Sequence, residues 1–285
     1  MQNKKKKNEF LKNFLHHKLA TISLIIVVIE LLVVFIFPIV GDLHPNDTDP
    51  LAFNAAPSAT HWLGTDDVGR DIFARVIYGG RTSLSIGILS VLISIMIGVP
   101  LGLTAGYYRG AWETIIMRAA DIFMSFPSMI LILVVVAIFG SSINTIILII
   151  GVLGWPSIAK LLYGNVLSVR KKDYVEAAKS IGTKESVIIF KYVLPNSVAP
   201  LWMSVAFRIS AAMITESGLS FLGAGVQPPE ASWGNIIQAA SNIMVLTNRP
   251  WIWIPAGLCL MLTIICINFI GEGVRDALDP KIKRV

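Results

Sequence analysis

Long apolar runs constrain this chain more than any other feature of its sequence. Six windows of about 20 mostly apolar residues are each long enough to cross the hydrocarbon core of a bilayer as a helix. Backbone polar groups must find internal partners there, so helices are the expected form. The windows are residues 19–40, 84–105, 114–139, 143–162, 197–215 and 251–270. The sequence therefore predicts an all-α integral membrane protein with six transmembrane helices.

The composition excludes an ordinary soluble domain. Hydrophobic residues make up 54% of the chain and charged residues only 15%, whereas a soluble domain carries roughly a quarter charged residues. The basic net charge of +6 could indicate nucleic-acid binding. The charge lies beside the apolar runs, however, where anionic lipid accounts for it. We therefore expect a lipid partner and no nucleic acid.

The distribution of lysine and arginine predicts the orientation. With the N-terminus inside, 19 of the 24 basic residues fall in cytoplasmic segments. Arg70, Arg75, Arg81 and Arg249 fall outside, and Arg208 lies within an apolar run. The positive-inside rule then predicts that both termini are cytoplasmic, N-in and C-in, in a multi-pass protein of the cell membrane.

The apolar runs divide the chain into expected segments. A basic cytoplasmic tail, residues 1–18, precedes the first helix at 19–40, which is too long for a typical signal-peptide core. An extracytoplasmic loop, 41–81, carries six aspartates without EF-hand spacing. A five-helix core follows at 82–275, with a cytoplasmic loop at 170–195, and a C-terminal tail occupies 276–285. The four histidines form no ligand cluster, so no metal is expected.

Ionisable residues within the apolar runs are costly and therefore suggest function. Glu30 could belong to a proton relay or be a hydrogen-bonded Glu at a helix contact. Arg208 and Glu216, eight residues apart on the fifth run, could line a translocation path or hydrogen-bond to neighbouring helices. Arg118 and Asp121 have the spacing of a helical ion pair.

The polar loop at 170–195 is unusually structured. Asp173 to Glu176 has the pattern of a capping box, with Asp173 as the N-cap. Gly182 suits a left-handed helix stop. A second helix from Lys184 is expected to be capped by Thr183 and ended by Pro195. This loop is therefore predicted to form two short helices joined at a glycine, with Ala177 and Ala178 presenting a smooth docking surface.

Sequence motifs for chemistry are absent. The chain has no phosphate-binding Gly-x-x-x-x-Gly-Lys-Ser/Thr loop and no Gly-x-Ser-x-Gly nucleophile elbow. We therefore expect no catalytic residues, no cofactor in this chain and no enzymatic activity of its own.

The cytoplasmic loop resembles the EAA loop of the permease subunits of ATP-binding-cassette (ABC) importers. The matching residues are Glu176, Ala177, Ala178, Gly182, Leu194 and Pro195, while Tyr192 stands where that family usually has an aliphatic residue. Other segments resemble the dipeptide and oligopeptide permeases of the C-subunit type. These are residues 61–66, 69–71, 80–84, 221–223, 228–229, 232–234 and 276–280.

This resemblance implies the type I ABC-importer (MetI-like) permease fold and a role in peptide transport. It assigns the six matching loop residues to a coupling helix that docks on an ATPase subunit. It implies two ABC ATPase subunits holding ATP and Mg, a homologous second permease forming a heterodimer, an extracytoplasmic substrate-binding protein and a bacterial membrane. Transport would proceed by alternating access.

Two alternatives stay open. The same permease type also carries nickel chelates and glutathione-like compounds, so the substrate could belong to either class. A proton-coupled peptide symporter, with Glu30 or Glu216 as the proton site, would need neither ATP nor accessory subunits.

Overall fold

The computed structural model describes residue 10 and residues 13–278. Of the predicted basic tail at 1–18, residues 1–9, 11 and 12 lie outside the described part. Residues 279–285 of the predicted C-terminal tail also lie outside it. The helices are α2 (Lys18–Val40), α3 (Ile72–Tyr108), α4 (Gly110–Ser125), α5 (Ser128–Phe139), α6 (Ile143–Val169), α7 (Asp173–Ser180), α8 (Glu185–Val187), a π-helical turn (Ile188–Val193), α9 (Leu194–Val198), α10 (Leu201–Phe221), α11 (Trp233–Gln238), α12 (Ile243–Asn248) and α13 (Ile254–Leu278), with short 3-10 turns at Ala239–Ser241 and Pro250–Ile252.

The expected all-helical fold is confirmed, and up to six elements can cross a membrane. In the described residues, α2, α3, α6 and α13 are each long and apolar enough to span. Two further pairs of helices are bent at a short break, and the number of spans rises to six if each bent pair is counted as one span. α4 and α5 meet at 84° around Pro127, and Glu185–Val198 meets α10 at 57°.

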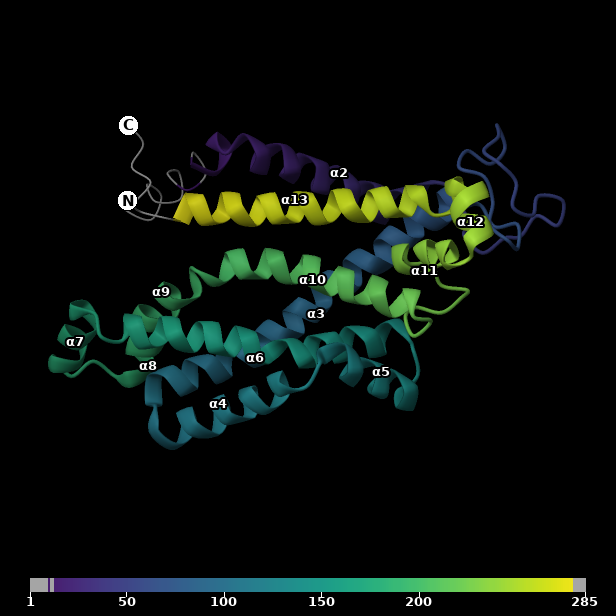
Figure 1. Cartoon of the computed structure of the whole chain (residues 1–285). Helices are drawn as coiled ribbons and strands as arrows, with labels where there is room; N and C mark the ends of the chain where they lie inside the picture. Colours follow the sequence, from purple (N-terminus) through teal and green to yellow (C-terminus); the bar gives the residue numbers. More distant parts are fainter. Residues whose placement is uncertain (1–9, 11–12, 279–285) are drawn as a thin grey trace.

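The long helices lie roughly side by side, with different loops at their two ends (Figure 1). The start of α2, the end of α13 and the α7–α9 segment share one end of the molecule. The loop 41–71, α11 and α12 lie at the other end. This arrangement agrees with the predicted grouping of the polar loop and the chain ends on one side. The N-in/C-in orientation itself stays a prediction.

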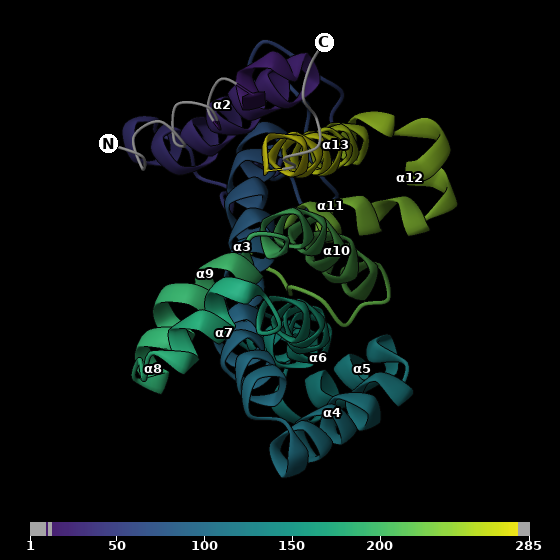
Figure 2. The ribbon, with the colours of Figure 1, turned by 90° about the vertical axis from the view of Figure 1, so that its left-hand side faces the viewer.

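Glycines bring α3 and α6 into close contact. A Cβ on Gly102 would lie 2.5 Å from the Ala159 carbonyl oxygen, and a Cβ on Gly106 would lie 2.7 Å from Val166 Cβ. The backbones can approach this closely only because these positions carry no side chain. The two helices therefore form the packed centre of the fold, as the end view also shows (Figure 2).

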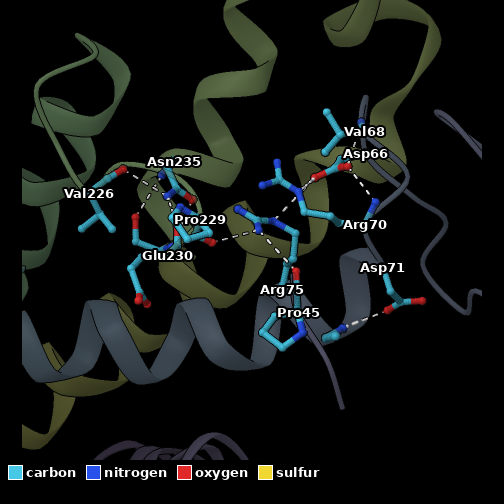
Figure 3. Close-up of polar contacts among 12 residues, drawn as sticks. Pro45, Asp66, Val68, Arg70, Asp71, Arg75, Val226, Pro229, Glu230 and Asn235 are labelled. Atoms are coloured by element: carbon cyan, nitrogen blue, oxygen red, sulfur yellow. Dashed lines mark hydrogen bonds and ion pairs between the residues drawn. The ribbon is translucent and has the colours of Figure 1, made fainter. Parts of the chain in front are cut away.

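The outer loop ends earlier than its expected boundary at Arg81. Asp71 caps α3 by accepting a hydrogen bond from the Ala74 N–H at 2.9 Å, so the helix starts at Ile72. Arg75, only 4% exposed, then reaches back to the loop and across to the 222–232 segment. Its guanidinium lies 3.7 Å from the Asp66 carboxylate and donates to the Pro229 carbonyl oxygen (Figure 3). The start of α3 is thus part of the outer assembly.

Candidate functional site

Helix α7 is amphipathic and attaches to the ends of the long helices through one face. Val175 is fully buried and Ala178 nearly so. Both pack in an apolar cluster with Tyr107 of α3, Val166 of α6 and Ile188. The expectation that Ala177 and Ala178 both present a surface is therefore wrong for Ala178, which belongs to the core.

The opposite face of α7 is exposed. It presents Tyr174, Glu176, Ala177 and, just past the helix end, Ile181. Ile181 is 82% exposed, although it is a large apolar residue. With Tyr174, which is 43% exposed, it gives this face apolar area beside the charged Glu176. We call these four residues the α7 outer face.

The predicted capping box does not form. The N-cap is Lys172, which makes no side-chain hydrogen bond to the helix among the described residues, and Asp173 is already the first helical residue. Asp173 and Glu176 both lie in the first turn and Lys179 in the last. The charges therefore stabilise α7 through the helix dipole rather than through a reciprocal cap.

The predicted left-handed stop at Gly182 is confirmed. Gly182 has φ +73°. Its N–H donates to the Lys179 carbonyl, and the Thr183 N–H donates to the Ala178 carbonyl at 3.1 Å. This pair of bonds is a Schellman motif, in which a glycine satisfies the last carbonyls of a helix. Thr183 therefore completes the end of α7 and does not cap the next helix, whose N-cap is Lys184.

Pro195 does not end the second helix as predicted. The chain widens into a π-helical turn over Ile188–Val193, and the Leu194 N–H bonds to the Ile189 carbonyl, five residues back. Pro195 lies in the first turn of α9, directly after this widened turn. The helix consequently continues past Leu194 and Pro195 to Val198.

Two basic residues converge on Tyr107 at the end of α3, one from α6 and one from α7. Arg170, the C-cap of α6, donates through Nη1 to the Tyr107 carbonyl oxygen at 2.8 Å and to that of Gly106 at 3.4 Å. Lys179 of α7 places its ammonium 5.6 Å above the Tyr107 ring, within cation–π range. Lys179 thus links α7 to α3, and Arg170 links α6 to α3 at the same point. Neither residue was predicted from the sequence to have this role, although a basic residue directly after an apolar run suggests a helix-end contact.

A second candidate site is a cavity of about 330 Å³ within the helical bundle. Arg208 of α10 lines it, and the role of this residue in a translocation path stays a prediction. Hydroxyl groups and apolar side chains supply much of the remaining wall, among them Ser94, Ser157, Thr215, Phe123, Met124 and Leu153. The cavity lies between α3, the α4–α5 bend, α6 and α10.

Glu216 is not among the residues that line this cavity. It is fully buried and accepts hydrogen bonds from Ser220 and Ser232 at 2.8 Å each and from Ser83 at 3.3 Å. The Ser83 hydroxyl also accepts from the Trp233 backbone N–H. The structure thus brings Arg208 but not Glu216 to the cavity, and Glu216 instead joins α3, α10 and α11.

The other ionisable residues make structural contacts. Glu30 accepts a hydrogen bond from the Thr263 hydroxyl at 2.5 Å, which matches the expected helix contact between α2 and α13. Asp121 pairs with Lys160 of α6 at 2.6 Å. The predicted Arg118–Asp121 pair is therefore wrong, because a lysine on the neighbouring helix takes the carboxylate.

No described group of three or more His, Cys, Asp or Glu side chains is arranged to hold a metal ion. His61 is the histidine with the most acidic surroundings. Its Nδ1 lies 2.8 Å from Asp71 and its Nε2 lies 3.8 Å from Asp49. These contacts hold the outer loop against the start of α3.

Two family profiles match the sequence. Residues 98–284 match the binding-protein-dependent transport system inner membrane component, and residues 8–57 match the N-terminal transmembrane domain of oligopeptide transport permease C.

Similar proteins carry related names. The glutathione transport system permease protein GsiD of Pectobacterium atrosepticum is 39% identical, over 96% of this chain and 91% of that protein. The dipeptide transport system permease protein DppC of Alkalihalophilus pseudofirmus is 38% identical, over 96% and 90%. An inward-facing structure of the MetNI methionine ABC transporter shares the fold, with a TM-score of 0.59 over 71% of this chain and 96% of that chain at 19% identity.

Proposed function

We propose that this chain, which belongs to the family of binding-protein-dependent transport system inner membrane components, imports small peptides as the permease subunit of an ABC transporter. Family membership confirms the resemblance seen in the sequence. It also fits a multi-pass location in the bacterial cell membrane, where the apolar helices would lie.

The observation that carries the proposal is the two-sided construction of α7. Its inner face packs on α3 and α6 through Val175 and Ala178, and Lys179 adds a contact with the Tyr107 ring. Its outer face is free to bind a partner. A helix built in this way can transmit a push from a bound partner to the membrane-spanning helices.

The partner in this proposal is an ABC ATPase subunit. Glu176, Ala177 and Gly182 would contact it directly. Ala178 is buried and would support this surface from the inner side, and the half-buried Leu194 and exposed Pro195 would end the loop. Two such ATPases, holding ATP and Mg, would close on ATP binding and move the two α7 helices of a permease pair. This chain would pair with a homologous permease and take no catalytic part.

The transport step would be alternating access. Closure of the ATPases would move α3 and α6 through α7, so that the permease pair opens outward to a substrate-binding protein. Arg208 would then line the path. ATP hydrolysis would return the pair to the inward-facing form.

The substrate class rests on relatives. Two similar permeases are named for glutathione and for dipeptides, and one matched profile is named for oligopeptides. All of these substrates are short peptides or peptide-like molecules. A nickel chelate is the alternative substrate within the same permease type. A competition experiment distinguishes the three substrate classes by measuring whether a dipeptide, glutathione or a nickel chelate displaces ligand from the substrate-binding protein.

The test is ATP-driven peptide uptake into vesicles containing the whole transporter. Glu176→Lys should abolish most uptake because it reverses a charge on the α7 outer face, while membrane insertion stays normal. The matched control is Glu230→Lys, which makes the same charge change on an exposed residue of the segment that joins α10 to α11, away from α7. Unchanged uptake in Glu176→Lys would contradict the coupling role.

A proton-coupled symporter is the competing function from a different class. It predicts uptake driven by a proton gradient alone, and loss of that uptake in Glu30→Gln. The Thr263 contact of Glu30 favours a structural role, so we expect ATP-dependent uptake to persist in Glu30→Gln. Uptake without any ATPase subunit would overturn the permease proposal.

A further inference from the structure

We propose that the Arg208 cavity is a transient binding site for the terminal carboxylate of a small peptide in transit. This inference rests on the proposed function and names the chemistry by which the permease itself holds its cargo. It assigns Arg208 as the residue that recognises the substrate anion.

The first argument is an uncompensated charge. Within residues 13–278, Arg208 makes no hydrogen bond or ion pair with the protein, and no carboxylate is among the residues that line the cavity. Arg208 lies seven residues into α10, about 10 Å along the helix from its start. A cation at such a depth is costly unless something satisfies it. A carboxylate in the cavity would do so through the paired N–H groups of the guanidinium.

The second argument is the position of the guanidinium beside a hydroxyl group on the cavity wall. A Cβ on Gly154 of α6 would overlap the Ser94 hydroxyl oxygen and would lie 3.6 Å from Arg208 Nη1, an ordinary van der Waals distance. Gly154 is therefore required by Ser94, and Arg208 Nη1 lies next to the same stretch of α6. The donor of the guanidinium and the hydroxyl oxygen of Ser94 thus share one part of the wall.

The third argument is the orientation of the hydroxyl groups. Ser94 donates its proton to the Gly151 carbonyl at 2.7 Å, and Thr215 donates to the Ala211 carbonyl at 2.8 Å. Ser157 likewise donates to the Gly154 carbonyl. Since these protons are already used, the hydroxyl oxygens are left with acceptor capacity. They suit the amide N–H groups or ammonium of a peptide, while Arg208 is the donor for its carboxylate.

The cavity dimensions favour a short peptide. A volume of about 330 Å³ lies at the lower end of the range of about 300–1,000 Å³ for small-molecule sites. Apolar side chains such as Phe123, Met124 and Leu153 complete the wall. They would accept varied side chains without selecting one, so recognition falls on the groups that every peptide shares.

The experiment measures peptide binding to the assembled transporter in nanodiscs, without its binding protein. Saturation-transfer NMR compares trialanine, which has a free carboxylate, with trialanine amide, which lacks it. Arg208→Gln should weaken trialanine binding about tenfold, as expected for loss of a charge-assisted hydrogen bond. Binding of the amide should change little. Arg118→Gln, which removes the same charge from an exposed position on α4, should leave both peptides as in the wild type.

The outcomes separate this inference from the proposed function. Equal binding of trialanine by wild type and Arg208→Gln, or an equal loss for both peptides, would overturn the carboxylate site. ATP-driven peptide uptake by the wild type is measured in parallel, with ATPase activity as the assembly control for each variant. If uptake occurs but Arg208→Gln binds trialanine normally, the inference fails and the proposed function stands.

Discussion

Arg170 Nη1 lies 2.8 Å from the Tyr107 carbonyl oxygen and so joins the end of α6 to the end of α3. The two helices that α7 packs against are therefore fastened to each other at the point where α7 attaches. A force applied to α7 reaches both helices together. This contact is the structural basis of the coupling proposed above.

Arg170→Met should uncouple ATP hydrolysis from transport. The variant loses hydrogen bonds from a charged group, each worth about 1.5–3 kcal/mol, and leaves the Tyr107 carbonyl without this donor. We expect the number of peptides imported per ATP hydrolysed to fall several-fold while hydrolysis continues. Lys171→Met, an exposed neighbour, is the control. An unchanged ratio in Arg170→Met would show that the contact carries no coupling.

Gly182→Val should destabilise the end of α7. The position has φ +73°, where a residue with a Cβ costs about 1–2 kcal/mol. No atom of the described residues lies within 4 Å of a Cβ placed on Gly182. A loss of stability in this variant would therefore come from the backbone conformation and not from a steric clash. Gly164→Ala is the matched control, because that glycine is also unobstructed but lies in helical α6, where alanine should stabilise by about 1 kcal/mol. Thermal unfolding and co-purification with ATPase subunits are measured for both variants. A melting temperature and an ATPase yield as high in Gly182→Val as in Gly164→Ala would contradict the left-handed stop.

Gly102→Val should break the contact between α3 and α6. Its Cβ would lie 2.5 Å from the Ala159 carbonyl oxygen, and the helices would have to separate. Overpacking of this kind typically costs about 1–3 kcal/mol or more. Gly257→Val on α13, where the described atoms leave the same space empty, should be tolerated. Thermal unfolding of the purified protein compares the two variants, and similar melting temperatures would be inconsistent with the close packing.

Glu216→Gln should loosen α11 from the bundle. Each carboxylate oxygen of Glu216 accepts hydroxyl protons, and an amide nitrogen cannot accept them. Leaving a buried donor unsatisfied costs about 1–3 kcal/mol. The loss should appear as a lower melting temperature, whereas Glu272→Gln, exposed on α13, should melt like the wild type. Equal melting of both variants would mean that the cluster contributes nothing to stability.

Apolar patterning predicted the approximate positions of the long helices because burial in a bilayer depends on local composition, while the count of six holds only if each bent pair is one span. It missed the start of α3 because Arg75 contacts the distant Pro45 and Pro229 carbonyls, and Asp71 contacts His61 of the outer loop. Such contacts depend on which loops meet in space. A single sequence does not report them.

The loop at 170–195 shows the same division between local and long-range information. Gly182 was predicted correctly, since a left-handed stop depends on one residue and its neighbours. The role of Asp173 was predicted wrongly because the N-cap lies one residue earlier, at Lys172. The role of Pro195 was predicted wrongly because a π-helical turn precedes it and the helix continues. Arg170 and Lys179 act through Tyr107, which is far away in the sequence.

Site-specific photo-crosslinking from Ile181 tests the central claim most directly. Ile181 is 82% exposed on the α7 outer face, and Ile243, 70% exposed on α12 at the opposite end, is the matched control. A photoreactive phenylalanine at each position is activated in membranes that contain the whole transporter. The account predicts a covalent adduct with an ATPase subunit from position 181 and none from 243. No ATPase adduct from 181, or an equal yield from 243, would contradict it.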